Sequence, residues 1–256
     1  MKKAKVIAIA NHKGGVAKTT TTASVGYILA KKGYKVLLVD LDAQANLTEC
    51  MSKEDLSDHC IYYALTGRSE HIDVVQLSEN LSIIPSSILL SKATMEMAGM
   101  ISREMRLKEL LKPVKGDYDF IILDCPPSEL GIILLNALTA ADDVIVPLVA
   151  EVLPFKGFSM LIDFINKIPK HLNSKIRLTG VLITRWENSS LSVNIEEGVR
   201  KQLGDKVFQT KIRKNVRLAE TPLESKNIIE YAPKSNGAKD YMAFTEELLE
   251  KLGFKS

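Results

Sequence analysis

The chain has 256 residues, 46% of them hydrophobic and 25% charged, so it contains enough apolar material for a sizeable core. Its formal net charge is only +3, and no run approaches the roughly 18 apolar residues that a membrane-spanning helix needs. The three cysteines, Cys50, Cys60 and Cys125, lack the spacing of metal ligands, which argues against a zinc site or a disulfide framework. The composition therefore predicts a cytoplasmic globular protein.

Short β-branched runs alternate along the chain with longer amphipathic stretches. The expected strands are 5–10, 35–39, 81–84, 119–123, 143–149, 177–184 and 207–210. The expected helices lie near 18–32, 59–66, 101–112, 131–140, 155–168, 192–204 and 236–252. This alternation implies right-handed βαβ crossovers, and it predicts an α/β fold with a doubly wound, mostly parallel twisted sheet flanked by helices. No repeat or linker interrupts the pattern, so we expect one domain over residues 1–256.

The most informative segment is the turn between the first expected strand and the first helix, at residues 11–20. A glycine-containing turn that leads into a helix presents backbone N–H groups to phosphate oxygens, and a lysine neutralises the outer phosphates. The standard G-x-x-x-x-G-K-[ST] pattern requires glycine where this chain has His12 and Ala17. The chain has instead a second lysine, Lys13, directly before Gly14 and Gly15. The segment therefore predicts a nucleotide-phosphate site of an unusual type.

Aspartates follow two of the expected strands. Asp40 and Asp42 follow the second strand, and Asp124 follows the fourth. Ligands of doubly wound sheets bind at the carboxyl ends of strands, so these acids should face the phosphate loop and, with the Thr19 hydroxyl, suit Mg²⁺. Asp40 and Asp42 alternate in an extended segment and should point to opposite sides. Only one of the two should reach the water that attacks the γ-phosphate, and the spacing leaves open which one.

A basic stretch lies between Val199 and Arg217. It contains one acid, Asp205, and the basic residues Arg200, Lys201, Lys206, Lys211, Arg213, Lys214 and Arg217. Such an excess is typical either of nucleic-acid binding or of a solvated helix face, and composition alone leaves both open.

Four motifs, in order, resemble those of the ParA/Soj chromosome- and plasmid-partitioning ATPases, a branch of the deviant Walker A group of P-loop proteins. The motifs are residues 13–19, 40–44, 124–127 and 215–220. The likeness extends from about residue 5 to residue 249, and the fourth motif, with residues 228–231 and 233–235 after it, narrows it to the ParA/Soj branch within the MinD/ParA superfamily.

The resemblance implies ATP and Mg²⁺ as cofactors and a weak intrinsic ATP hydrolase activity. Lys13 would contact the partner subunit's phosphates in an ATP-dependent sandwich homodimer, Lys18 would hold the β- and γ-phosphates, and Asp42 would orient or activate the water. The implied nucleotide-binding residues are Lys13, Gly14, Gly15, Val16, Ala17, Lys18, Thr19, Thr20, Arg213 and Asn215. The implied metal-site residues are Thr19, Asp124 and, in the outer shell, Asp40.

The resemblance also implies partners. The ATP-bound dimer would bind non-specific DNA through Arg217, with Lys214 and Arg185 as further contacts, and would associate with the nucleoid. A ParB-type centromere-binding protein would stimulate hydrolysis and so release the dimer from DNA. The phosphate loop starts about a dozen residues into the sequence, so no N-terminal helix-turn-helix domain is expected.

The chain departs from the family pattern at three places. Ala17 replaces the usual glycine, and its Cβ costs about 1–2 kcal/mol if the backbone there is left-handed. Arg213 and Lys214 stand where the family more often has Pro-Arg. Asn188 occupies a position where relatives often have a second DNA-contacting arginine, for which Arg185 is a candidate substitute.

Two alternative functions remain at this point. A MinD-like membrane-surface positioning ATPase requires a basic amphipathic helix at the C-terminus. The segment 241–252 is instead acidic, so no membrane partner is expected. A ParA-like ATPase that positions a protein cargo is compatible with the same motifs, and the sequence leaves the cargo open.

Overall fold

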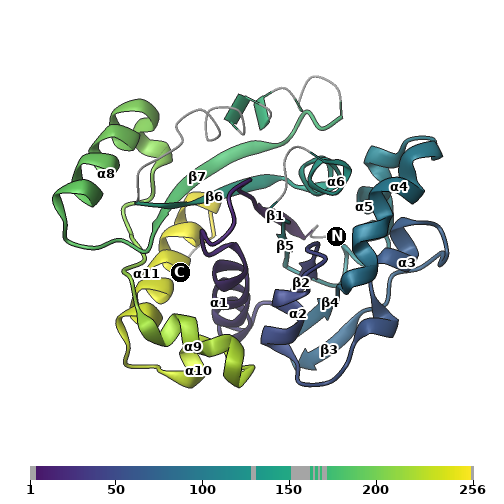
Figure 1. Cartoon of the computed structure of the whole chain (residues 1–256), viewed down its shortest axis with the longest axis horizontal. Helices are drawn as coiled ribbons and strands as arrows, with labels where there is room; N and C mark the ends of the chain where they lie inside the picture. The colour runs from purple at the N-terminus through teal and green to yellow at the C-terminus, as the bar shows by residue number, and fades with distance from the viewer. Residues whose placement is uncertain are drawn as a thin grey trace.

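The protein is built around one sheet of seven strands in the order β3-β4-β2-β5-β1-β6-β7 (Figure 1). The computed structural model describes residues 4–127, 131–150, 162, 163, 165, 166, 168 and 172–254. The strands are β1 Lys5–Ile9, β2 Val36–Asp40, β3 Val75–Ser78, β4 Leu81–Ile84, β5 Phe120–Asp124, β6 Asp143–Val149 and β7 Arg177–Thr184. Neighbouring strands are parallel except β3 and β4, which are antiparallel. The predicted α/β fold with a mostly parallel sheet is confirmed.

Helices flank this sheet on both faces (Figure 1). The α-helices are α1 Lys18–Lys31, α2 Asn46–Met51, α3 Tyr62–Leu65, α4 Ala93–Glu96, α5 Arg106–Leu111, α6 Ile132–Ala140, α8 Ser190–Leu203, α9 Val216–Glu224, α10 Ile228–Tyr231 and α11 Asn236–Leu252. Short 3-10 helices are η1 Ser57–His59, η2 Ile88–Lys92, η3 Met97–Gly99, η4 Arg103–Met105 and η6 Gly204–Lys206. Within the described part of the chain, every helix is too short or too polar to cross a membrane.

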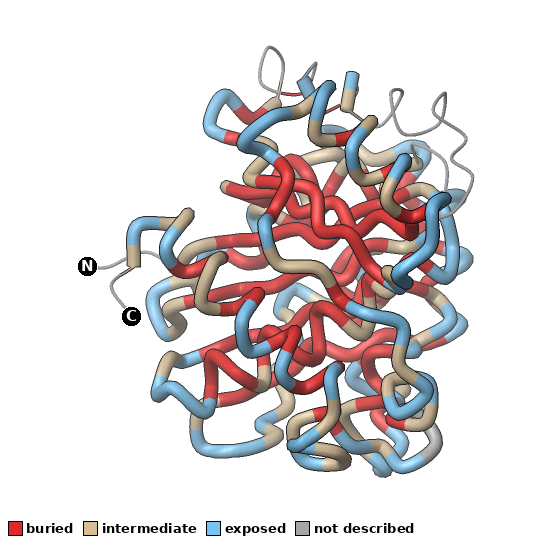
Figure 2. The backbone as a smooth tube through the Cα atoms, turned by 90° about the vertical axis from the view of Figure 1, so that its left-hand side faces the viewer, coloured by how far each residue is buried: buried red, intermediate tan, exposed pale blue. Residues whose placement is uncertain are grey.

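Alternate residues of the central strands supply two separate cores. In β1, Val6 and Ala8 pack with the side of the sheet that α5 and α6 cover, whereas Ile7 and Ile9 pack with the side that α1 and α11 cover. Because both faces are covered, these strands are apolar throughout, as parallel strands generally are. Figure 2 shows the result, a buried centre of strands with exposed segments at the periphery.

Several predicted elements have the predicted bounds. The strands at 81–84, 143–149 and 177–184 and the helix at 236–252 agree with β4, β6, β7 and α11. The predicted helix at 59–66 is shorter, since only Tyr62–Leu65 forms an α-helix. The predicted helix at 155–168 falls largely outside the described residues. Strand β3 was not predicted, because four residues at the edge of the sheet give too short an alternating pattern to stand out.

The predicted strand at 207–210 is wrong. Val207 forms only an isolated bridge with Val181. The next two available backbone N–H groups, of Gln209 and Thr210, donate to the carboxylate of Glu247 on α11, at 2.7 and 2.8 Å. A side chain therefore takes the donors that a further strand pairing would use.

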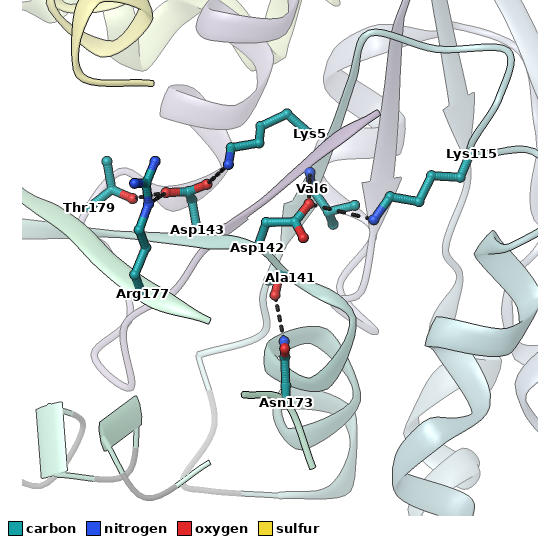
Figure 3. Close-up of polar contacts among 9 residues, drawn as sticks. All are labelled: Lys5, Val6, Lys115, Ala141, Asp142, Asp143, Asn173, Arg177 and Thr179. Atoms are coloured by element: carbon teal, nitrogen blue, oxygen red, sulfur yellow. Dashed lines mark hydrogen bonds and ion pairs between the residues drawn. The ribbon is translucent and has the colours of Figure 1, made fainter. Parts of the chain in front are cut away.

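The amino edge of the sheet contains a buried acid, Asp143, at the start of β6 (Figure 3). The ammonium of Lys5 lies 2.8 Å from this carboxylate, and Arg177 and Thr179 of β7 donate to it. Paired cations and a hydroxyl thus stabilise the negative charge at this edge. The acids at the opposite, carboxyl edge have different surroundings.

Candidate functional site

A cavity of about 660 Å³ opens at the carboxyl ends of the strands. Its walls are the phosphate loop with the start of α1, the segment from β2 to α2, the end of β7 and the segment that leads into α9. The lining residues are Gly14, Gly15, Ala17, Lys18, Thr19, Thr20, Asp42, Asn46, Glu49, Cys50, Pro127, Thr184, Arg185, Ile212, Arg213, Lys214, Asn215, Val216, Leu218, Ala219 and Tyr241. The volume falls within the range of small-molecule sites, roughly 300–1,000 Å³.

The phosphate loop is fixed by two buried polar side chains. Asn11 donates from Nδ2 to the Pro147 carbonyl at 2.7 Å and accepts from the Lys13 backbone N–H at 3.0 Å. Thr184, at the end of β7, donates from Oγ1 to the Val16 carbonyl at 3.1 Å. Strands β6 and β7 therefore hold the loop in position, and Val16 is buried beneath it rather than lining the cavity.

Lys18 places a buried ammonium at the mouth of the loop. Its side-chain Nζ donates to the Lys13 carbonyl at 3.0 Å, and the residue is 7% exposed. Burial lowers the pKa of this ammonium, and the nearby carboxylate of Asp124 opposes that shift. Lys13 itself is exposed and lies outside the cavity lining.

The loop adopts left-handed backbone at two positions. Gly15 has φ 71°, which glycine adopts without strain, and Ala17 has φ 69° and ψ 32°. The alanine that replaces the usual glycine at position 17 therefore occupies the left-handed region, where a Cβ lowers stability. Its Cβ contributes about 1–2 kcal/mol of local strain just before α1.

Two of the strand-end acids, Asp40 and Asp124, lie side by side. Asp40 of β2 and Asp124 of β5 are register partners in neighbouring parallel strands. Asp124 accepts from the Thr19 hydroxyl at 2.7 Å and more weakly from Thr22 at 3.4 Å. Burial raises the pKa of Asp124, and the negative charge of Asp40 raises it further. This corner of the site therefore combines two carboxylates and a hydroxyl, the oxygen ligands that a hard cation prefers.

The structure distinguishes Asp40 from Asp42. Asp40 is fully buried and accepts from the Asp42 backbone N–H at 3.1 Å and from Thr48 N–H and Oγ1 at 2.9 and 2.8 Å. Burial raises its pKa above the ordinary value. Asp42 lines the cavity, with one oxygen accepting from the Gln44 N–H at 3.0 Å. Asp42 is therefore the one of this pair that faces the cavity.

The segment before α9 forms the opposite wall. Arg213 and Asn215, which the resemblance implies as nucleotide-binding residues, line the cavity. The guanidinium of Arg213 makes a two-pronged ion pair with Asp240 of α11, with a closest approach of 2.6 Å. Asn215 accepts from the Arg217 backbone N–H at 2.9 Å and so stabilises the first turn of α9.

The three candidate DNA-binding residues lie beside this wall. Arg185 and Lys214 line the cavity at its rim, and all three of Arg185, Lys214 and Arg217 are exposed. Lys214 pairs with Glu187 at 2.8 Å, and Arg217 pairs with Glu220 at 2.9 Å. Exposed ion pairs of this kind contribute roughly 0–1 kcal/mol, so both cations are available for exchange to other anions.

Sequence reasoning missed several residues of the site. Thr184 had a usable signal, because it is a polar residue at the end of an apolar strand, the position that predicted Asp124. Asn46, Glu49 and Cys50 enter the cavity because α2 folds back over the β2 end. Tyr241 had no local signal, since it is one buried position in the long helix α11.

Comparison with known proteins agrees with this geometry. A family model described as an AAA domain matches residues 4–178. The chain is 43% identical over 248 residues to the sporulation initiation inhibitor protein Soj of Bacillus subtilis, covering 95% of this chain and 98% of that one. It is 37% identical over 253 residues to the chromosome-partitioning ATPase Soj of Treponema pallidum, covering 97% and 98%. The chain belongs to the ParA/Soj family.

The fold of this family member is also similar to solved structures. One is a Mycobacterium smegmatis protein named cobyrinic acid a,c-diamide synthase, determined with a bound ATP analog and magnesium. It superposes with a TM-score of 0.85, is 34% identical, and the match covers 98% of this chain and 96% of that one. The family predicted from four motifs is therefore confirmed over nearly the whole chain.

Replacing Ala17 with glycine should stabilise this ParA/Soj chain. Glycine relieves the left-handed strain at position 17, which is worth about 1–2 kcal/mol. It also costs about 0.5–1 kcal/mol, because glycine gives the unfolded chain more conformational entropy. The relief of strain is the larger effect. We expect Ala17→Gly to raise the free energy of unfolding by about 0.5–1 kcal/mol in urea denaturation. The control is Ala243→Gly on the exposed face of α11, which should lower it by about 1 kcal/mol. A loss of stability in Ala17→Gly would contradict the strain.

Proposed function

We propose that this chain is a Mg²⁺-dependent partitioning ATPase whose ATP-bound homodimer binds DNA non-specifically. The observation that supports this most is that Lys18, Thr19 and Asp42 line one cavity, and that the Thr19 hydroxyl bonds to the buried carboxylate of Asp124 behind it. The membership in the ParA/Soj family supports the same activity.

ATP fits the cavity with its phosphates on the loop and its base toward the segment before α9. Backbone N–H groups of Gly14, Gly15 and the start of α1 are well suited to bind the phosphate oxygens. Lys18 would exchange its bond to the Lys13 carbonyl for the β- and γ-phosphates. The apolar side chains of Ile212 and Leu218 offer a surface for the base.

Mg²⁺ suits the corner formed by Thr19 and Asp124. Both groups are hard oxygen ligands. The 2.7 Å hydrogen bond between the Thr19 hydroxyl and the Asp124 carboxylate places their oxygens next to each other. The pKa of Asp124, raised by burial and by Asp40, indicates a carboxylate that a nearby cation would stabilise in its charged form. When bound, Mg²⁺ neutralises phosphate charge; Thr19 would hold it directly, with Asp124 and Asp40 behind it.

Asp42 and Lys13 have separate roles in this proposal. Asp42 lines the cavity and would orient or activate the attacking water. Lys13 is exposed beside the loop and would cross to the phosphates of the partner subunit, so that ATP joins the two chains. Hydrolysis removes the γ-phosphate that both subunits bind, and the dimer then separates.

DNA binding would use the rim formed by Arg185, Lys214 and Arg217. Two such rims in a dimer gain affinity on one DNA through effective concentration, without additional contacts. A ParB-type partner would accelerate hydrolysis and release the DNA, and the ATP-bound dimer would associate with the nucleoid. Non-specific binding to phosphates should weaken steeply with salt.

The two active-site substitutions Lys13→Ala and Asp42→Ala should separate dimerisation from hydrolysis. We expect Lys13→Ala to bind ATP but to remain a monomer in light scattering, because the cross-subunit cation is lost. Asp42→Ala should form a dimer that persists, because water is no longer activated. Lys35→Ala, an exposed lysine at the amino edge of the sheet, is the control and should dimerise normally. An ATP-dependent dimer of Lys13→Ala would defeat the cross-subunit role.

Substitutions on the rim should alter DNA affinity in opposite directions. Lys214→Ala combined with Arg217→Ala should weaken non-specific binding and make the slope of log K against log salt less negative by about 1.8, since each phosphate contact contributes about 0.9. Glu220→Gln, which removes the ion-pair partner of Arg217, should strengthen binding. Salt-titrated fluorescence anisotropy measures both. If the double variant retained its ATPase activity and its DNA affinity were unchanged, these residues would not form the DNA-binding surface.

A further inference from the structure

Arg213 introduces two donors into a wall of the nucleotide cavity. An arginine has a backbone N–H, a free φ and a guanidinium, whereas a proline at this position would have no N–H and a fixed φ. Residue 213 lies in a segment that lines the cavity. The segment therefore needs a restraint to keep one conformation.

The neighbouring backbone groups are already committed to β7 and the residues after it. The Ile212 N–H donates to the Ile183 carbonyl at 2.9 Å, and the Ile212 carbonyl accepts from Trp186 at 3.0 Å. The Lys214 N–H donates to the Trp186 carbonyl at 3.0 Å. The N–H of Arg213, between them, faces away from this pairing toward α11.

Asp240 on α11 accepts both of the donors that Arg213 introduces. Its Oδ2 accepts from the Arg213 backbone N–H at 3.0 Å and from Nε at 2.9 Å, and its Oδ1 accepts from Nη2 at 2.6 Å. Asp240 is 8% exposed, whereas the side chain of Arg213 is 44% exposed, so the carboxylate is shielded from water on its side of the pair and the guanidinium is partly open to solvent. One buried carboxylate thus fixes both the main chain and the side chain of residue 213.

The next residue of α11 reaches the opposite wall. Tyr241 lines the cavity and its hydroxyl lies 3.1 Å from Oγ1 of Thr21, which is buried in α1 two residues after Thr19. Asp240 and Tyr241 therefore join the base-side wall and the phosphate-side helix to the same turn of α11. The spacing between the two walls depends on this turn.

We propose that Asp240 is a positioning residue for nucleotide binding, which holds the base-side wall in place through Arg213. The inference rests on the proposed function, since it takes ATP to be the ligand of the cavity. The Asp240–Arg213 pair restrains a position whose φ is otherwise free. We expect the effect to be on the affinity for ATP, because the hydrogen bonds and ion pair of Asp240 in the described part of the chain go to Arg213 and not to the phosphate loop or Asp42.

The same helix offers a matched control. Glu247, two turns further along α11, accepts from the backbone N–H groups of Gln209 and Thr210 at 2.7 and 2.8 Å. Like Asp240, Glu247 is a carboxylate of α11 that accepts from backbone N–H groups of this segment, but it binds no guanidinium, and residues 209 and 210 lie outside the cavity lining. Removing the Glu247 carboxylate therefore measures how ATP binding responds when this segment is less firmly attached to α11.

The test compares Asp240→Ala with Glu247→Ala in the full chain by ATP titration calorimetry and by steady-state ATPase assay. Asp240→Ala should weaken ATP binding roughly tenfold and raise KM by a similar factor, with kcat at saturating ATP unchanged. Glu247→Ala should leave both constants unchanged. Equal effects of the two substitutions on ATP affinity, or none from Asp240→Ala, would overturn the positioning role.

A rescue variant separates positioning from a folding defect. Adding Arg213→Pro to Asp240→Ala removes both unpartnered donors and gives residue 213 a fixed φ, so the double variant should bind ATP more tightly than Asp240→Ala alone. A double variant as weak as Asp240→Ala would contradict the proposal. Failure of the unaltered chain to bind ATP would instead refute the proposed function, and the two outcomes are therefore distinct.

Discussion

The structure depends on two carboxylates buried side by side. Asp40 and Asp124 are register partners at the carboxyl ends of β2 and β5, and both are almost completely shielded from water. Buried like charges are costly unless hydrogen bonds and cations compensate. Thr48 satisfies Asp40, and Thr19 bonds to Asp124, so each acid organises the segment that supplies its donor. The α2 turn and the start of α1 are thereby fixed around one point.

The amino edge of the same sheet also contains a buried acid, but there the negative charge has cations as fixed partners. Asp143 is equally buried, but Lys5 and Arg177 supply fixed cations at its carboxylate. At the carboxyl edge, the cation nearest Asp124 is Lys18, whose ammonium bonds to a backbone carbonyl rather than to the acid. The carboxyl edge thus has two buried acids directly behind the Thr19 hydroxyl, and Thr19 lines the cavity together with the basic loop. Oxygen ligands next to a basic phosphate loop are the arrangement that Mg²⁺ and a polyphosphate require.

The sequence was sufficient to predict six of the seven strands of the sheet, because strand period is a local signal. The glycine turn and the strand-end acids are also local signals, and they directed attention to the segments that surround the cavity. It left open whether Asp40 or Asp42 faces the cavity, since the answer depends on Thr48, which returns from α2 to Asp40. The strand expected at 207–210 fails for a similar reason: Glu247, distant in sequence, takes its backbone donors. In both cases a side chain on a helix, Thr48 on α2 or Glu247 on α11, determined what the strand and turn patterns did not.

The central claim is that Thr19 and Asp124 form the cation corner of an ATP site. It is tested most directly by calorimetric titration of ATP, with Mg²⁺ and with EDTA, into the original chain and Thr19→Val, which replaces the hydroxyl with a methyl group of similar size. The account predicts that Mg²⁺ strengthens ATP binding in the original chain and has little effect in Thr19→Val. An undiminished Mg²⁺ effect in Thr19→Val would contradict it.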